Sequence, residues 1–164
     1  MKINRSVSLL SALLAGVFLI SCGSTKTTVE KEQKALRIRE DVASSHFTFN
    51  ATTAYPMNYK PIHLTSSYEL KISKDTVKAY LPYFGRAYVA PVDPSESGIK
   101  FTSTRFEYKA IQGKRQGSWA VTIKTFDTDR SFTLYLDIWD NGSGQLRVSD
   151  PNRQSISFEG EVKQ

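Results

Sequence analysis

Strict alternation of apolar and polar residues is the feature that most constrains the fold of this chain. The clearest run is residues 132–138, where every second side chain is apolar. Because successive side chains of a β-strand point to opposite faces, this run predicts a strand with one packed face and one wet face. The apolar set should be buried together and the polar set exposed: Phe132, Leu134, Leu136 and Ile138 against Thr133 and Asp137. Further alternating runs lie at residues 46–51, 68–72, 76–81, 99–101, 106–108, 119–123, 146–148 and 156–159.

Short turn sequences separate these runs and predict hairpins. Such sequences lie at residues 73–75, 113–117, 127–129, 140–144 and 150–152. Asn141-Gly142 can place two residues at positive φ, as a type I′ turn requires. About eight short strands joined in this way predict a mainly β fold, an antiparallel meander that forms a small barrel or a two-layer sandwich. An outer-membrane barrel is not favoured, because the alternating Lys and Glu residues would all have to face its lumen.

One helix is predicted at the N-terminal end of the β-rich part, over residues 28–44. Thr27 and Glu30 fit a capping box, with Thr27 as the N-cap. The apolar residues form a narrow stripe on an otherwise charged helix. This pattern favours a helix that docks along a sheet, with a solvated stalk as the alternative. The stripe consists of Ala35, Leu36, Ile38, Val42 and Ala43.

The first 21 residues have the pattern of a secretory signal peptide. Lys2 and Arg5 precede an uncharged stretch at residues 7–20, which is short for a membrane span because a spanning helix needs roughly 20 apolar residues. The stretch ends in Leu19-Ile20-Ser21-Cys22, which resembles the bacterial lipobox. The resemblance implies that the Cys22 thiol is joined to a diacylglyceryl group. It also implies that cleavage leaves Cys22 as the first mature residue.

This N-terminus predicts three segments: a lipoprotein signal peptide at 1–21, a lipidated tether at 22–27 and a single β-rich domain at 28–164. Cys22 is the one cysteine, which excludes an internal disulfide. Two acyl chains, such as palmitate, anchor stably because each buried CH₂ contributes about 0.8 kcal/mol. No acidic residue directly follows Cys22, which in enterobacteria favours the outer membrane. We therefore expect a cell-envelope protein anchored to the outer membrane, on its periplasmic side.

Residues 80–92 depart from the alternation and carry the most distinctive cluster of side chains. Pro82 lacks the N–H that a central strand needs, and Gly85 is expected at positive φ, where a residue with a side chain would be strained. Two interpretations remain open. The structural one is a turn that plugs the end of a barrel, with Arg86 satisfying buried carbonyls. The functional one is a ligand platform, in which Tyr83, Arg86 and Tyr88 line a pocket and Phe84 forms its floor.

The segment Leu81-Pro82-Tyr83-Phe84-Gly85-Arg86-Ala87 resembles the LPYFGRA motif of the DUF4251 family, whose members are uncharacterised lipoproteins found mainly in Bacteroidetes. The resemblance covers roughly residues 35–162. It implies no activity, because the family is defined by sequence alone. Further matching pieces are Phe47–Ala51, Pro56-Met57, Gly98–Ser103, Asn152-Arg153 and Ile156–Gly160.

No sequence motif for catalysis, metal binding or cofactor binding is present. The chain lacks a Gly-rich phosphate loop, HExxH, CxxC and GxSxG, so we expect no cofactor and no metal. His46 and His63 are expected at the surface or at strand ends. The Asp residues at 127–129 and 137–140 could offer oxygen ligands for calcium, but turn formation explains them better.

Two function classes remain: a non-catalytic envelope lipoprotein that binds a protein or small ligand, and an envelope hydrolase with a spatially assembled carboxylate site. We favour the first. The mature chain would keep 20 basic against 16 acidic residues, because Lys2 and Arg5 leave with the signal; this excess is too thin to indicate nucleic-acid binding. The carboxylates Glu69, Glu107, Asp137 and Glu159 are expected on the wet face of their strands.

Overall fold

The computed structural model describes residues 24–89 and 98–163. The chain divides into two compact units, residues up to Gln33 and residues from Lys34 to Gln164. The predicted signal peptide and Cys22 lie outside the described residues. Within the described part, no helix combines the length and apolarity needed to cross a bilayer.

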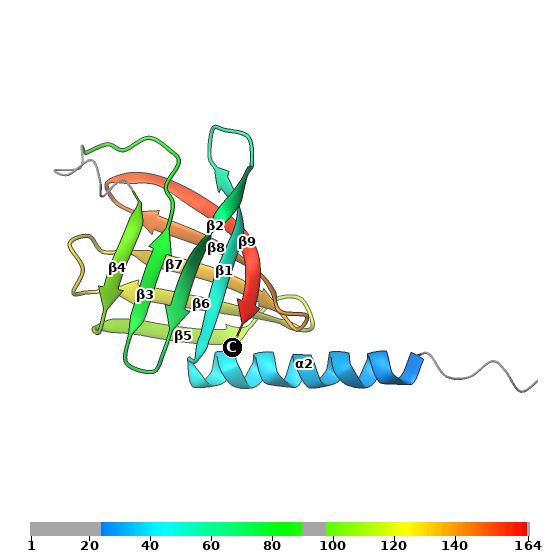
Figure 1. The fold of residues 1–164 in the computed structure, drawn as a ribbon. Coiled ribbons are helices and arrows are strands. Elements are labelled where there is room, and N and C mark those ends of the chain that lie inside the picture. Colours follow the sequence, from blue (N-terminus) through cyan, green and yellow to red (C-terminus); the bar gives the residue numbers. More distant parts are fainter. Residues whose placement is uncertain (1–23, 90–97, 164) are drawn as a thin grey trace, which may run out of the picture. The chain divides into compact units, whose positions relative to one another are not determined.

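The unit from Lys34 onward is built on one antiparallel sheet of nine strands (Figure 1). The order of the strands in the sheet is β4-β3-β2-β1-β9-β8-β7-β6-β5, and every described neighbouring pair is antiparallel. The prediction of a mainly β antiparallel fold with one helix is confirmed. The strands are β1 (Phe47–Pro56), β2 (Ile62–Ile72), β3 (Val77–Leu81), β4 (Ile99–Ser103), β5 (Phe106–Gln112), β6 (Ser118–Thr125), β7 (Thr133–Trp139), β8 (Ser143–Asp150) and β9 (Arg153–Lys163).

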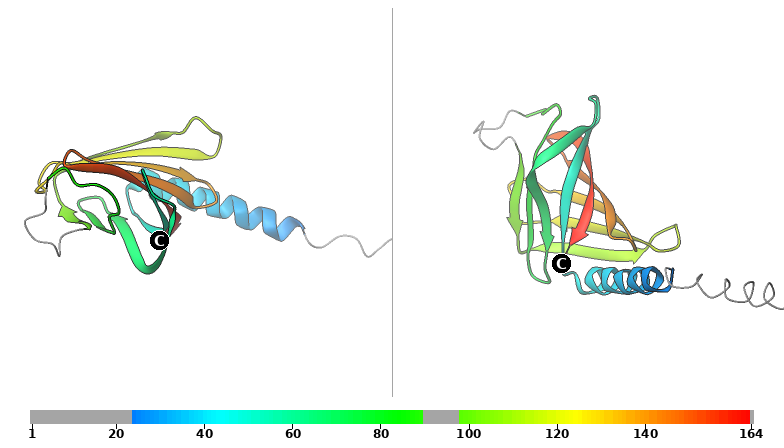
Figure 2. Two further views of the ribbon diagram at one scale, coloured as in Figure 1. Left: turned by 90° about the horizontal axis from the view of Figure 1, so that it is seen from above. Right: turned by 45° about the vertical axis from the view of Figure 1, so that its right-hand side comes forward.

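The two edge strands of the sheet are consecutive in the sequence, and this makes the sheet curl into a nearly closed barrel (Figure 2). Only Thr104 and Arg105 separate the end of β4 from the start of β5, so the two edges must meet at one corner. The Asp127 carboxylate fastens that corner. It accepts hydrogen bonds from the Ser103 hydroxyl, from the Thr104 amide (2.8 Å) and hydroxyl (3.0 Å), and from the Arg105 amide (3.0 Å). These hydrogen bonds, the one from Ser103 foremost, hold the Asp127 pKa below its usual range.

The inner face of the curled sheet is packed with apolar side chains. In β7 the predicted faces are confirmed: Leu134, Leu136 and Ile138 are buried, as is Phe132 just before the strand, whereas Asp137 is exposed. Burial of each such side chain contributes about 1.5–3 kcal/mol.

Two glycines and a bulge let the sheet bend tightly around Phe49. The β1 register shifts between Ala51 and Thr53 against both neighbouring strands, and such bulges bend a strand. The Phe49 ring lies on Gly144 and Gly160, which face each other across β8 and β9. A Cβ atom on Gly160 would collide with the Asn50 carbonyl oxygen and lie 2.9 Å from the Phe49 ring.

Helix α2 (Ser24–Ser44) ends where the sequence predicted but begins four residues earlier. Thr27 therefore lies inside the helix, and the predicted N-cap there is wrong, because extending a formed helix costs little per residue. At the other end Ser45 (φ 55°) closes a Schellman motif, in which the His46 amide bonds the Asp41 carbonyl at 3.0 Å.

The last turns of α2 pack into the core of the sheet. Ile38 and Val42 are buried with the strand residues, so docking rather than a solvated stalk describes this part of the helix. The Tyr108 hydroxyl donates to the Val42 carbonyl at 2.7 Å, next to the weaker 3.3 Å bond from the Ser45 amide, and so ties the end of the helix to β5. Burial raises the Tyr108 pKa to about 12.

The predicted type I′ turn at Asn141-Gly142 is also wrong. Gly142 has φ +82°, but Asn141 is not at positive φ. The Gly142 amide bonds the Trp139 carbonyl at 2.7 Å, which gives a three-residue loop with a glycine bulge at its end. The loop takes this form because the Asn141 side chain accepts from the Ser143 amide at 3.0 Å.

Candidate functional site

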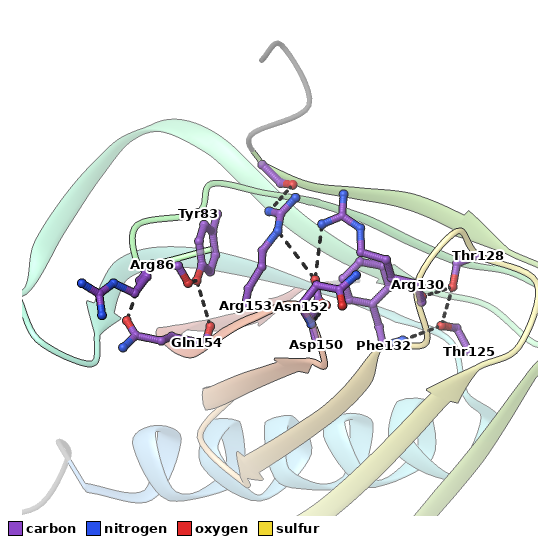
Figure 3. Close-up of polar contacts among 11 residues, drawn as sticks. Tyr83, Arg86, Thr125, Thr128, Arg130, Phe132, Asp150, Asn152, Arg153 and Gln154 are labelled. Atoms are coloured by element: carbon purple, nitrogen blue, oxygen red, sulfur yellow. Dashed lines mark hydrogen bonds and ion pairs between the residues drawn. The ribbon is translucent and has the colours of Figure 1, made fainter. Parts of the chain in front are cut away.

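The segment that follows β3 leaves the sheet at Pro82 and runs along the start of β9 (Figure 3). Ala87 forms an isolated antiparallel bridge with Arg153. The Gln154 amide donates to the Arg86 carbonyl (3.1 Å), and the Gln154 side chain accepts from the Arg86 amide (3.2 Å). The Tyr88 amide donates to the Asn152 carbonyl (2.8 Å). The segment is thus held mainly through its backbone, at the residues that open β9.

The Tyr83 side chain folds back onto its own segment and hydrogen-bonds the backbone there. Its hydroxyl lies 2.9 Å from the Arg86 carbonyl and 3.1 Å from the Gln154 carbonyl, and it donates its proton between them. The ring returns over Gly85, where a Cβ atom would lie 2.8 Å from the Tyr83 hydroxyl. Gly85 itself is not at positive φ, so the expectation that it takes a left-handed conformation is wrong. A close approach of the Tyr83 ring, not backbone strain, explains the glycine.

Arg153 links this segment to a buried carboxylate. Its guanidinium lies 4.9 Å from the centre of the Tyr83 ring, and it donates to the Gly98 carbonyl at 3.1 Å. Its Nε atom is 3.6 Å from Asp150 Oδ2, and both side chains are 5% exposed. Arg130 contributes a second cation 3.5 Å from the same Asp150 oxygen. Asp150 is therefore a buried anion between two arginines, one of which also holds the aromatic segment.

The loop that carries Arg130 is ordered by a chain of hydrogen bonds (Figure 3). The Phe132 amide donates to the Thr125 hydroxyl (3.1 Å), which lies 2.8 Å from the Thr128 hydroxyl. Thr128 in turn donates to the Arg130 carbonyl (2.6 Å). The Phe132 ring stacks on Phe101 of β4, with ring centres 4.6 Å apart. Loop and edge strand are thereby joined across the open side of the sheet.

A cavity of about 410 Å³ lies at this junction, and two of its four charged side chains have hydrogen-bonding or ionic partners in the fold. We call it the seam cavity; its lining is Gly98, Lys100, Phe101, Thr102, Asp127, Thr128, Asp129, Arg130 and Phe132. Asp127 is committed to the β4–β5 corner and Arg130 to Asp150. Because these two groups are bonded to structural partners, we interpret the cavity as part of the packing between loop and edge strand before we interpret it as a ligand site.

The outer face of the sheet carries a second hollow space, on the side away from the core. A hollow of about 520 Å³ and a smaller one of about 260 Å³ share Asp137 and Gln145, and together we call them the outer trough. The larger is lined by Ile111, Gln112, Gly113, Lys114, Arg115, Ser118, Ala120, Asp137, Trp139 and Gln145. The smaller is lined by Tyr135, Asp137, Gln145, Arg147 and Ser157.

The residues predicted for a ligand platform differ in burial. Tyr83 and Phe84 are half-buried and pack against the core, and Pro82 is half-buried beside them. Arg86 and Tyr88 are exposed, with Tyr88 63% accessible. Neither the seam cavity nor the outer trough is lined by Pro82, Tyr83, Phe84, Gly85, Arg86 or Tyr88.

Other sequence expectations concern the polar side chains on the strands. Glu107, Asp137 and Glu159 are exposed as predicted, whereas Glu69 is half-buried. Glu159 accepts a hydrogen bond from the Tyr55 hydroxyl at 2.6 Å. His46 and His63 are exposed. Among the residues that the structure describes, no three His, Cys, Asp or Glu side chains gather as a metal site would need.

Sequence reasoning missed the Asp150 ion pairs and the outer trough. Asp150 and Arg153 flank the Asp-Pro-Asn turn three residues apart, a spacing at which opposite charges can pair, and this was the available signal. Arg130 gave none, because its pairing with Asp150 spans twenty residues. Trp139 extends the β7 alternation by one residue and faces outward with Asp137, but a single outward Trp does not reveal a trough.

Comparisons with known proteins agree on the fold. The profile of DUF4251, described as a domain of unknown function, matches residues 29–162. The crystal structure of a DUF4251 family protein from Bacteroides eggerthii superposes with a TM-score of 0.59 at 11% sequence identity, covering 79% of this chain and 87% of that one. No curated protein matches this chain.

Proposed function

The chain belongs to the DUF4251 family, a domain of unknown function, and we propose that it is a lipid-anchored cell-envelope domain that binds a ligand without catalysis. The anchor would be a diacylglyceryl group on Cys22, and the protein would lie on the periplasmic side of the outer membrane. This proposal joins the N-terminal sequence pattern to the surface of the β-rich unit.

The composition of the outer trough is the observation that carries the binding role. The Asp137 and Gln145 side chains make no hydrogen bond or ion pair with any described residue, although each lines both hollows. An aromatic ring, that of Trp139, lies beside them. Aromatic surface with a few unengaged polar groups is the usual make-up of a ligand site.

The same trough argues against the hydrolase alternative. Glycoside hydrolysis commonly needs two carboxyl groups flanking the bond, and Asp137 is the one carboxylate among the residues lining the two hollows. The seam cavity is lined by two carboxylates, Asp127 and Asp129, but Asp127 has a lowered pKa and bonded oxygens, whereas a general acid needs a raised pKa.

Two measurements on the full-length protein test this function. Wild-type protein should incorporate radiolabelled palmitate and sediment with the outer membrane, whereas Cys22→Ala should do neither. Purified protein should release no product from p-nitrophenyl glycosides, esters or phosphates. Turnover that disappears in Asp137→Asn would establish the hydrolase alternative, and an unlabelled wild-type chain would disprove the anchor.

A further inference from the structure

We propose that the outer trough binds a glycan, with a pyranose ring stacked on Trp139 and its hydroxyls held by Asp137 and Gln145. This inference rests on the proposed binding function and names its ligand class. The trough lies on the face of the sheet opposite the core, because Asp137 and Trp139 alternate along β7 with the buried Leu136 and Ile138.

The strand register sets the geometry of the site. Asp137 is paired with Ala120 on one side and with Gln145 on the other. Directly opposed residues on neighbouring strands have Cβ atoms about 5 Å apart, so the carboxylate and the amide lie side by side. A carboxylate accepts and an amide both donates and accepts, which suits two neighbouring hydroxyls of one sugar.

Trp139 supplies the apolar platform next to this pair. It lies two residues beyond Asp137, a separation of about 7 Å along the strand, and it is paired with Ser118 of β6. The small Ala120 and Ser118 keep the floor beside the ring low, and Ile111, 53% exposed, forms a wall. An indole face next to unengaged polar groups fits the C–H face of a pyranose, which is apolar while its rim carries hydroxyls.

The other aromatic ring of the trough is already covered. The Arg147 guanidinium lies over the Tyr135 ring at 4.7 Å from its centre. Tyr135 therefore acts as a fixed wall, and its Arg147 cover can donate hydrogen bonds. From Ile111 on β5 to Ser157 on β9 the trough crosses five neighbouring strands, or about 19 Å, which is room for more than one sugar unit.

The polar groups of the trough favour a glycan over other occupants. The lining carries Lys114, Arg115 and Arg147 against the one carboxylate Asp137, so its charge admits an acidic as well as a neutral sugar. The large apolar side chains of the trough are Ile111 and Tyr135, which are exposed, and Trp139, which is half-buried; Tyr135 is covered by Arg147. A protein partner would find few apolar anchors there. A ligand rich in hydroxyls satisfies the carboxylate, the amide and the guanidinium together.

Tryptophan fluorescence gives a direct readout of stacking. The chain has two tryptophans, so Trp119→Phe leaves Trp139 as the one reporter. The full-length variant, in a zwitterionic detergent without sugar, is titrated with chitohexaose, laminarin and polygalacturonate. At least one of these glycans should shift the emission of Trp139 in a saturable way.

Matched variants then locate the binding surface by isothermal titration against the glycan that binds. Trp139→Ala and Asp137→Ala should each weaken binding at least tenfold, about 1.4 kcal/mol, with unchanged circular dichroism spectra. Phe126→Ala removes an exposed aromatic side chain outside the trough and should bind like wild type.

Two results would overturn the inference. One is the absence of binding by all three glycans, and the other is undiminished binding by both trough variants. Neither result bears on the lipid anchor or on the lack of catalysis, because membrane anchoring and turnover are measured in separate assays. Hydrolysis of the bound glycan would instead disprove the non-catalytic role while leaving the trough as the site.

Discussion

Replacing Arg153 by Met should destabilise the domain more than any change at an exposed position of the Leu81–Tyr88 segment. Met keeps much of the apolar stem and removes the guanidinium. The substitution therefore removes one of the two cations beside Asp150, the hydrogen bond to the Gly98 carbonyl and the cation that covers the Tyr83 ring. All of this happens in a site where the Arg153 side chain is 5% exposed.

The structure sets the size of the loss. Removing one partner of a buried ion pair costs about 3–5 kcal/mol, because the remaining charge is stranded. Arg130 still lies 3.5 Å from Asp150, so the lower end of that range applies. Loss of the aromatic contact adds about 1 kcal/mol at most, and these terms overlap. We expect about 3 kcal/mol, a large share of the 5–15 kcal/mol typical of a domain.

The assay is equilibrium urea unfolding of the full-length protein, followed by circular dichroism at 25 °C. The midpoint should fall while the slope with urea stays unchanged, and the melting temperature should drop by about 10 °C. Asp150→Asn is made alone and together with Arg153→Met. The double variant should be at least 1 kcal/mol more stable than the sum of the single changes, because no anion is left for the missing cation.

Either of two outcomes would refute this reasoning. An Arg153→Met protein within 0.5 kcal/mol of wild type would show that the guanidinium does not hold the segment. Strict additivity in the double variant would show that Asp150 and Arg153 do not interact energetically.

Further predictions concern the segment, the sheet and the helix end. Phe84→Ala should lower the free energy of unfolding in urea by about 2 kcal/mol, because the ring is half-buried against the core. Arg86→Ala should change it by less than about 0.5 kcal/mol, because its side chain is exposed. Equal losses in the two variants would contradict this assignment. Gly160→Ala should cost about 3 kcal/mol or more in the same assay, since its Cβ would strike the Asn50 carbonyl of the neighbouring strand, and a wild-type midpoint would disprove the close packing. Tyr108 has a folded-state pKa of about 12 against 10 when unfolded, so its contribution to the free energy of unfolding is complete below pH 10 and is lost as the pH rises toward 12. Tyr108→Phe should therefore flatten the dependence of stability on pH between pH 10 and 12, and an unchanged dependence would refute the assignment.

The alternation of residues determined the strands and their buried faces by itself. A one-residue shift would turn every side chain of residues 132–138 to the wrong side, so the pattern permits one orientation. The same local logic placed the end of the helix at Ser44. The local pattern gave wrong backbone conformations at Thr27, Asn141 and Gly85, where the conformation depends on neighbouring residues. At Gly85 the missing side chain makes room for the Tyr83 ring, which packs over it.

Only the tertiary structure decided which distant residues meet. The curl of the sheet follows from the placement of β4 and β5 at opposite edges, and no local pattern encodes strand order. The same holds for Asp150, whose partner Arg130 lies on another loop, and for the outer trough, whose lining comes from five strands. Alternation says that Trp139 and Gln145 face outward. Their meeting around Asp137 depends on pairing between β7 and β8, and thus on the long-range packing that sets the register.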